Sequence, residues 1–270
     1  MKKSILLGLM AGIVSLTACD VDLLDIPQQG VTSEESFYKT DQDCEEAIAA
    51  VYRSWRTAFS GGHSGASQYA NGFFLKNLLA DDFNTGGTRS DQTYAQEIFE
   101  SAIMPTNGWV EAYYKDLYST VYLCNLIIEK FNPEESSIKA RNIAEAKFYR
   151  ALCYFELTTL WGNPPKVDRV LQNSEEYKVP NSTQEELWAF IETDLNDAIN
   201  SGALTSKVDL NDKDGCTRAT LEAAKTLLAK TYLFQQKYSD AKSLFKDVIE
   251  SGKYDLEDDI DMFYHTAGNG

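Results

Sequence analysis

The chain has 270 residues, 43% of them hydrophobic, so it is long enough to bury the core of one large domain or of two ordinary ones. Its 25 Lys and Arg residues face 41 Asp and Glu residues, which gives a formal net charge of −16. A chain this acidic repels phosphate, which disfavours nucleic acid as a partner, and the charge otherwise indicates only a solvated surface.

The N-terminus has the pattern of an exported protein. Lys2 and Lys3 precede an apolar stretch, residues 5–16, which is too short for an ordinary transmembrane helix but has the size of a secretory signal core. Small residues then precede Cys19, in an arrangement that resembles the bacterial lipobox. We therefore predict a lipoprotein signal peptide over residues 1–18 and attachment of acyl chains such as palmitate at Cys19. An ordinary signal peptide followed by a chance cysteine is the alternative.

Residues 19–39 predict a polar tether. They contain Asp20, Asp22 and Asp25, followed by Pro-Gln-Gln-Gly, and they show no helical spacing of apolar residues. Such a tether would hold a globular body, residues 40–270, off a membrane surface to which Cys19 anchors it.

Helical spacing of apolar residues begins after Thr40, which is a candidate N-cap. It predicts a helix over 41–59, which Gly61 and Gly62 then end. Residues 60–106 are predicted to be mostly loop, with one short helix around 72–80.

From residue 107 onward the pattern is almost entirely helical, so the predicted fold class is all-α. The predicted helices cover 109–131, 135–160, a segment capped by Ser182-Thr183 and closed by Gly202, Thr217–Gln235, and 239–250. The first of these is followed by Pro133, which stops a helix.

Two pairs of helices share the spacing of tetratricopeptide-like units. Small and aromatic residues occupy the positions where two such helices touch, at Ala229, Tyr232, Ala241, Phe245 and Val248. The same spacing recurs at Ala151, Tyr154, Ile191, Leu195 and Ala198, with a long insert between the two helices. We predict such units over about 109–131, 135–202 and 217–251. Within the insert, Trp161-Gly-Asn-Pro-Pro is interpreted as a helix stop and a turn, and a ligand-binding role for Trp161 is the less favoured alternative.

Four further cysteines follow Cys19. Cys44, Cys124 and Cys153 fall on the apolar faces of predicted helices, and neither they nor Cys216 form a CxxC pair. We favour buried free thiols over disulfides or a metal site.

Motifs for catalysis and for cofactors do not occur. The sequence has no HExxH, GxSxG, P-loop or GxGxxG motif and only two histidines. The acidic run 209–215 fails the register of a calcium loop and is read as a turn. We predict no catalytic residue, no cofactor and no metal site.

A carbohydrate site needs flat aromatic faces together with amide or charged groups for the hydroxyls. The loop at 60–106 contains such residues, which become candidates on composition alone: Asp81, Phe83, Asn84, Arg89 and Tyr94. The alternative is that they are ordinary loop and packing residues.

Several segments together carry a resemblance to a known family. They are AEAKFYRALCYFELTTLWGNPP at 144–165, ELWAFIETDLNDAI at 186–199, and residues 217–256, which begin Thr-Arg-Ala-Thr. With Cys19 and its tether, they resemble the RagB/SusD-like lipoproteins of Bacteroidetes. The resemblance implies a non-enzymatic lipoprotein, exposed on the outer membrane, that captures glycans or other nutrients. It would deliver them to a SusC-like TonB-dependent transporter.

The chain departs from that family in length. Relatives continue for roughly as many residues again, and that second half supplies much of their ligand site. The resemblance therefore implies that a C-terminal ligand-binding half is absent, so that the chain looks like a fragment or a truncated product. The alternative function is a tetratricopeptide-type scaffold in the outer membrane that binds only protein. A cell-envelope hydrolase is disfavoured because the sequence displays no positioned acid pair or nucleophile.

Overall fold

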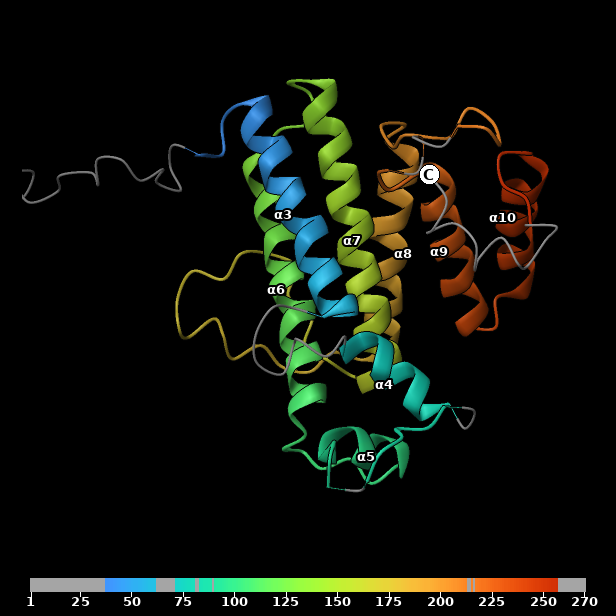
Figure 1. Cartoon of the computed structure of the whole chain (residues 1–270). Coiled ribbons are helices and arrows are strands. Elements are labelled where there is room, and N and C mark those ends of the chain that lie inside the picture. The colour runs from blue at the N-terminus through green and yellow to red at the C-terminus, as the bar shows by residue number, and fades with distance from the viewer. Residues whose placement is uncertain are drawn as a thin grey trace, which may run out of the picture. The chain divides into compact units, whose positions relative to one another are not determined.

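A computed structural model describes the chain over residues 37–61, 71–80, 83–88, 90–212, 215 and 217–256 (Figure 1). Internal contacts separate residues 1–38 from residues 39–270, and the description below concerns the second unit. The predicted signal peptide 1–18, Cys19 and nearly all of the tether 19–39 lie outside the described residues.

The described residues are organised as helices. They are α3 (Asp41–Ser60), α4 (Asn71–Leu79), α5 (Thr93–Phe99), α6 (Gly108–Lys130), α7 (Ser137–Trp161), α8 (Gln184–Asn200), α9 (Leu221–Phe234) and α10 (Tyr238–Glu250). Only two isolated β-bridges, and no strand, occur in these ranges, which confirms the all-α prediction. None of the described helices is both long and apolar enough to cross a membrane.

Side-chain caps explain where most of the long helices begin. The N-cap side chain accepts a hydrogen bond from a backbone N–H of the first turn, which would otherwise be unsatisfied. This occurs at Thr40, Asn107, Ser136, Thr183 and Thr220.

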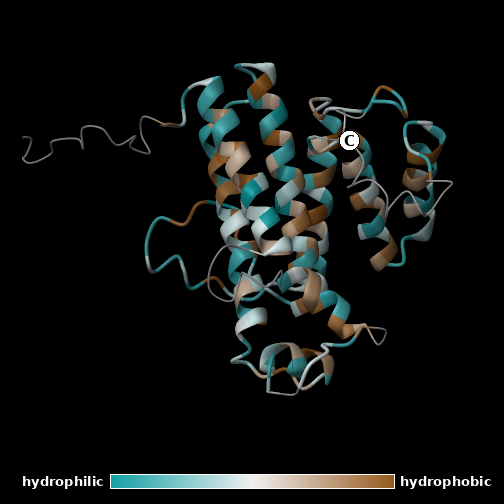
Figure 2. Ribbon diagram, in the orientation of Figure 1, coloured by the Kyte–Doolittle hydropathy of each residue, from teal (hydrophilic) through white to brown (hydrophobic). Residues whose placement is uncertain are grey.

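The helices pack in a continuous series. α3, α6 and α7 pack against one another, α8 packs on α7, α9 on α8, and α10 on α9 (Figure 1). α4 contacts α3, α5 and α6. Each helix carries both hydrophobic and hydrophilic residues along its length (Figure 2), as expected when one face packs and another meets solvent. The exception is α7, which is buried on most of its circumference, polar positions included.

The small residues at the predicted helix contacts are buried. Ala151 of α7, Ala198 of α8, Ala229 of α9 and Ala241 of α10 are all buried, and α7 packs on α8 as α9 packs on α10. Small side chains at these points let the helix backbones approach closely. Of α10, however, only Ala241 is buried.

One predicted helix start was wrong, and one helix was not predicted. α9 begins at Leu221 and not at Thr217, because tertiary contacts hold the preceding residues out of the helix. The Arg218 Nε donates to Glu145 at 2.7 Å, and the Ala219 N–H donates to the Tyr52 hydroxyl at 2.7 Å. In addition, α5 forms within the segment predicted to be loop.

The buried-thiol prediction is confirmed for Cys44, Cys124 and Cys153, which are all buried and free. Burial is the main cause that raises the pKa of each thiol, for Cys44 to about 11. Cys216 lies outside the described residues.

Because a thiolate, not a thiol, reacts with alkylating reagents, these three cysteines should be inert in the native protein. We expect a variant carrying Cys19→Ser and Cys216→Ser to take up no iodoacetamide at pH 8. In urea it should take up three equivalents, one for each buried thiol, as measured by intact mass. Rapid labelling without denaturant would contradict this burial.

Candidate functional site

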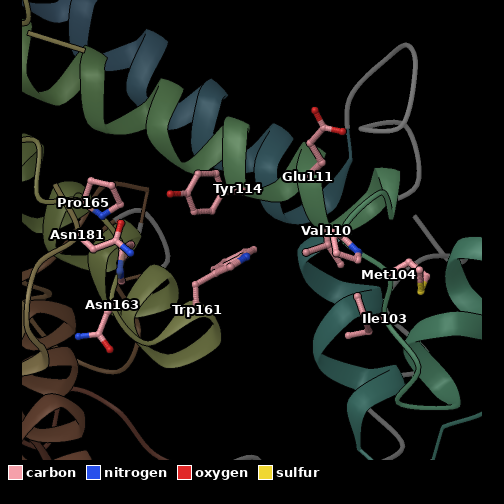
Figure 3. Close-up of a pocket in the computed structure, with 11 residues that line it drawn as sticks. Ile103, Met104, Val110, Glu111, Tyr114, Trp161, Asn163, Pro165 and Asn181 are labelled. Atoms are coloured by element: carbon pink, nitrogen blue, oxygen red, sulfur yellow. The ribbon is translucent and has the colours of Figure 1, made fainter. Parts of the chain in front are cut away.

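A pocket of about 500 Å³ opens where the C-terminal end of α7 meets the N-terminal part of α6 (Figure 3). Tyr114 from α6 and Trp161 from the end of α7 form its centre. Their ring centroids lie 5.2 Å apart, and the ring planes meet at 68°. We call this site the Trp161 pocket.

Two sides flank this aromatic centre, as Figure 3 shows. Apolar side chains lie on one side, among them Met104 from the segment before α6 and Val110 from the first turn of α6. Asn163, Pro165 and Asn181, from the segment between α7 and α8, lie on the other. The pocket therefore combines ring faces with amide groups.

The local sequence at the end of α7 places Trp161 at the surface. Gly162 follows it with a φ of 76°, a left-handed conformation that favours glycine, and its N–H donates to the Thr158 carbonyl at 3.0 Å. Pro164 then prevents the helix from resuming. The predicted helix stop is thus present, and the half-buried Trp161 ring nevertheless borders the pocket.

Tyrosine hydroxyls hold the segment that forms the amide side. The Tyr118 hydroxyl donates to the Pro165 carbonyl at 2.6 Å, and the Tyr154 hydroxyl accepts from the Val167 N–H at 2.6 Å. Burial raises the pKa of both hydroxyls well above the usual range, so both stay neutral. The pocket wall at Pro165 is therefore fixed before any ligand binds.

A buried polar cluster also holds the segment between α7 and α8. The Arg150 guanidinium donates twice to the Asp194 carboxylate, at 2.7 Å each, and once to Asn125 Oδ1 at 2.7 Å. Arg150 also donates to the Asp168 carbonyl at 3.1 Å, and Asn125 Nδ2 donates to the Val167 carbonyl at 3.1 Å. Burial raises the pKa of Asp194, and its hydrogen bonds from Arg150 act in the opposite direction. The cluster ties α6, α7 and α8 to one loop.

The chemistry of the Trp161 pocket is that of binding. Aromatic faces can stack on the apolar faces of a pyranose ring, and the amides of Asn163 and Asn181 can hydrogen-bond its hydroxyls. Glu111 lies at the edge of the pocket and pairs with Lys115 at 2.5 Å. Nowhere in the described part of the chain do three potential metal ligands come together.

Three of the sequence-predicted ligand residues are described by the structure, and these three lie away from the Trp161 pocket. The Phe83 ring packs edge-on against Phe73 and Phe74, at centroid distances of 6.3 and 6.5 Å. The Asn84 Oδ1 accepts from the Gly86 N–H at 3.0 Å and so closes a turn. The Tyr94 side chain is exposed on α5.

Asp81 and Arg89 lie outside the described residues, and the ligand role of all five stays a prediction. Of the three that the structure describes, Phe83, Asn84 and Tyr94, none lines the Trp161 pocket. The sequence analysis favoured a helix stop at Trp161 and kept a ligand role as the less favoured alternative, and it did not single out Tyr114. One available signal was the spacing of Tyr114, Tyr118 and Tyr122, four residues apart on one helix.

The sequence was compared with known protein families. The model of a SusD-like family, described as "Starch-binding associating with outer membrane", matches residues 30–233, which is more than half of the chain. The chain belongs to the SusD-like family. A SusD-like protein of Bacteroides ovatus is 25% identical over 286 residues, covering 99% of this chain and 48% of the relative.

Solved structures of SusD-like proteins have a similar fold. A laminarin-binding SusD-like protein is 28% identical with a TM-score of 0.73, covering 85% of this chain and 49% of its own. Surface glycan-binding protein A from Bacteroides thetaiotaomicron, solved in complex with laminarihexaose, is 23% identical with a TM-score of 0.68, covering 85% of this chain and 47% of its own. This SusD-like chain thus spans about half the length of the relatives that it matches.

Proposed function

We propose that this SusD-like chain binds carbohydrate as part of a cell-surface lipoprotein, without chemical turnover. One observation carries the proposal, which is the crossed ring pair of Tyr114 and Trp161 beside the amides of Asn163 and Asn181. A laminarin-binding protein among the similar structures supports the choice of a glycan over other nutrients.

We further propose that the captured glycan passes to a SusC-like TonB-dependent transporter. Lipid attachment at Cys19 would hold the protein at the outer membrane, facing the exterior, and residues 19–39 would act as its tether. Tethering two partners raises the effective concentration of one at the other, so capture beside a transporter increases the supply of ligand to it. The SusD-like relatives are about twice as long, so the Trp161 pocket would form one part of a larger binding surface.

A protein-binding scaffold is the second candidate function. Large apolar side chains are exposed on α9 and α10, namely Leu233, Phe234, Tyr238 and Ile249. Exposed apolar clusters of this kind mark surfaces that contact other proteins. This face would bind a protein partner without a glycan site.

Replacing Trp161 tests the carbohydrate proposal. We expect Trp161→Ala to lower the affinity for starch or laminarin about tenfold, because one stacking face is lost. The loss is measured as weaker retardation in native gels that contain the polysaccharide. Tyr238→Ala, which removes an exposed tyrosine on α10, is the matched control and should migrate like the unaltered protein.

Two results would contradict the proposal. If neither starch nor laminarin in the gel slowed the unaltered protein, the scaffold function would be favoured. Released oligosaccharides after prolonged incubation would show turnover, which a binding protein lacks.

A further inference from the structure

We propose that the Trp161 pocket continues along α6 as an open glycan groove, so that the site takes an oligosaccharide chain and not only one or two sugar units. Tyr114, Tyr118 and Tyr122 form the floor of this groove, and we call them the tyrosine stripe. The proposal rests on the carbohydrate-binding function proposed above and extends it to the length of the ligand.

The stripe follows from helix geometry. Residues four apart lie on the same helix face, and the eight residues from Tyr114 to Tyr122 span about 12 Å along the helix axis. The rings of Tyr114 and Tyr118 lie 4.9 Å apart between centroids, and Tyr122 is 48% exposed. The first two rings are thus direct neighbours, and Tyr122 follows at the same spacing along the helix.

The groove is continuous with the Trp161 pocket. A second depression, of about 690 Å³, lies over α6 and is lined by all three tyrosines together with Lys115, Ser119 and Leu123. Tyr114 lines both depressions. A chain whose end stacks on Trp161 could therefore extend over Tyr118 toward Tyr122 without leaving the aromatic surface.

The backbone beyond Pro165 is hydrogen-bonded to α6 at three points. The Pro165 carbonyl accepts from Tyr118, the Val167 carbonyl from Asn125, and the Val170 N–H donates to Glu129 at 2.6 Å. These contacts fall at successively later positions of α6, so the loop runs along the helix. Because its hydroxyl is already bound to the protein, the Tyr118 ring is held in place, which lowers the entropic cost of binding.

The surroundings of the stripe favour a glycan over a protein. Protein-binding patches have a wide apolar core, whereas here a single row of rings is bordered by Lys115 and Ser119, both exposed. A narrow aromatic row with polar groups beside it fits a linear chain that presents ring faces and hydroxyls in turn.

Chain-length dependence tests the groove. The full chain would be titrated with laminaribiose and laminarihexaose, and with maltose and maltohexaose, and binding followed calorimetrically. We expect Tyr122→Ala to weaken binding of the hexasaccharide that the protein prefers by roughly fivefold, while the disaccharide is unaffected. Tyr122→Phe, which keeps the ring, should bind almost like the unaltered protein, and Tyr238→Ala is again the control.

The outcomes separate this proposal from the proposed function. If Trp161→Ala weakens binding as expected but Tyr122→Ala leaves the hexasaccharide affinity unchanged, the groove is wrong and the carbohydrate function stands. If the unaltered protein binds neither glucan series nor either polysaccharide, both fail. If Tyr122→Ala changes only co-purification with the transporter, the stripe is a protein contact and the groove is overturned.

Discussion

Asp194→Ala is expected to lower the free energy of unfolding by about 3–5 kcal/mol, because it leaves the Arg150 guanidinium buried without its carboxylate. Arg150 is only 5% exposed and Asp194 only 2%, so water cannot take the place of the lost partner. The same change should loosen the loop at Asp168, because Arg150 donates a hydrogen bond to the backbone carbonyl of Asp168. Urea denaturation followed by circular dichroism measures the change in stability.

Two further variants make this prediction specific. Asp197 lies one turn further along α8 and pairs with Lys147, but its side chain is 50% exposed, so Asp197→Ala should cost less than about 1 kcal/mol. Replacing both partners, as Arg150→Met with Asp194→Leu, should recover much of the loss, since no unpaired charge stays buried. An equal loss for Asp194→Ala and Asp197→Ala would contradict the role given to the buried pair.

Glu145→Ala should have the second largest effect, a loss of about 3 kcal/mol in the free energy of unfolding. The Glu145 carboxylate is fully buried in α7, accepts from Arg218 at 2.7 and 2.9 Å, and accepts from the Tyr52 hydroxyl at 3.1 Å. It therefore joins α3 and α7 to the corner that precedes α9. Arg218 keeps Glu45 and Asn142 as partners, which limits the loss.

Hydrogen exchange can locate this effect. Amides at the start of α9 should exchange faster in Glu145→Ala, while those in the middle of α6 should stay protected. Glu145→Gln, which keeps the shape and one acceptor, should lose less stability than Glu145→Ala. Glu175→Ala breaks an ion pair with Lys178 in which both side chains are exposed, and should cost less than about 1 kcal/mol. Unchanged exchange at α9 would show that the ion pair does not hold that corner.

The correct start of α8 and the wrong start of α9 have one explanation, which is the distance along the chain of the contacts that fix each start. α8 could be placed from Thr183 because its cap and its Glu186 partner are neighbours in the sequence. The start of α9 could not, because Arg218 and Ala219 are held by Glu145 and Tyr52, which lie far away in the chain. The Arg-Ala-Thr segment that contributed to the family resemblance thus has a structural role. Arg218 forms an ion pair with Glu145, the Ala219 N–H donates to the Tyr52 hydroxyl, and Thr220 caps α9.

The sequence by itself determined the all-α class, most helix limits and the family, because helical periodicity, caps and glycine stops act over a few residues. It also indicated which cysteines are buried. Only the tertiary structure decided that Tyr114, Trp161 and Asn181 meet in one pocket, since their distances in the chain are bridged by packing between helices. Spacing likewise places the three rings of the tyrosine stripe on one face of α6, but only the packing of the helices decides that a depression lies over them.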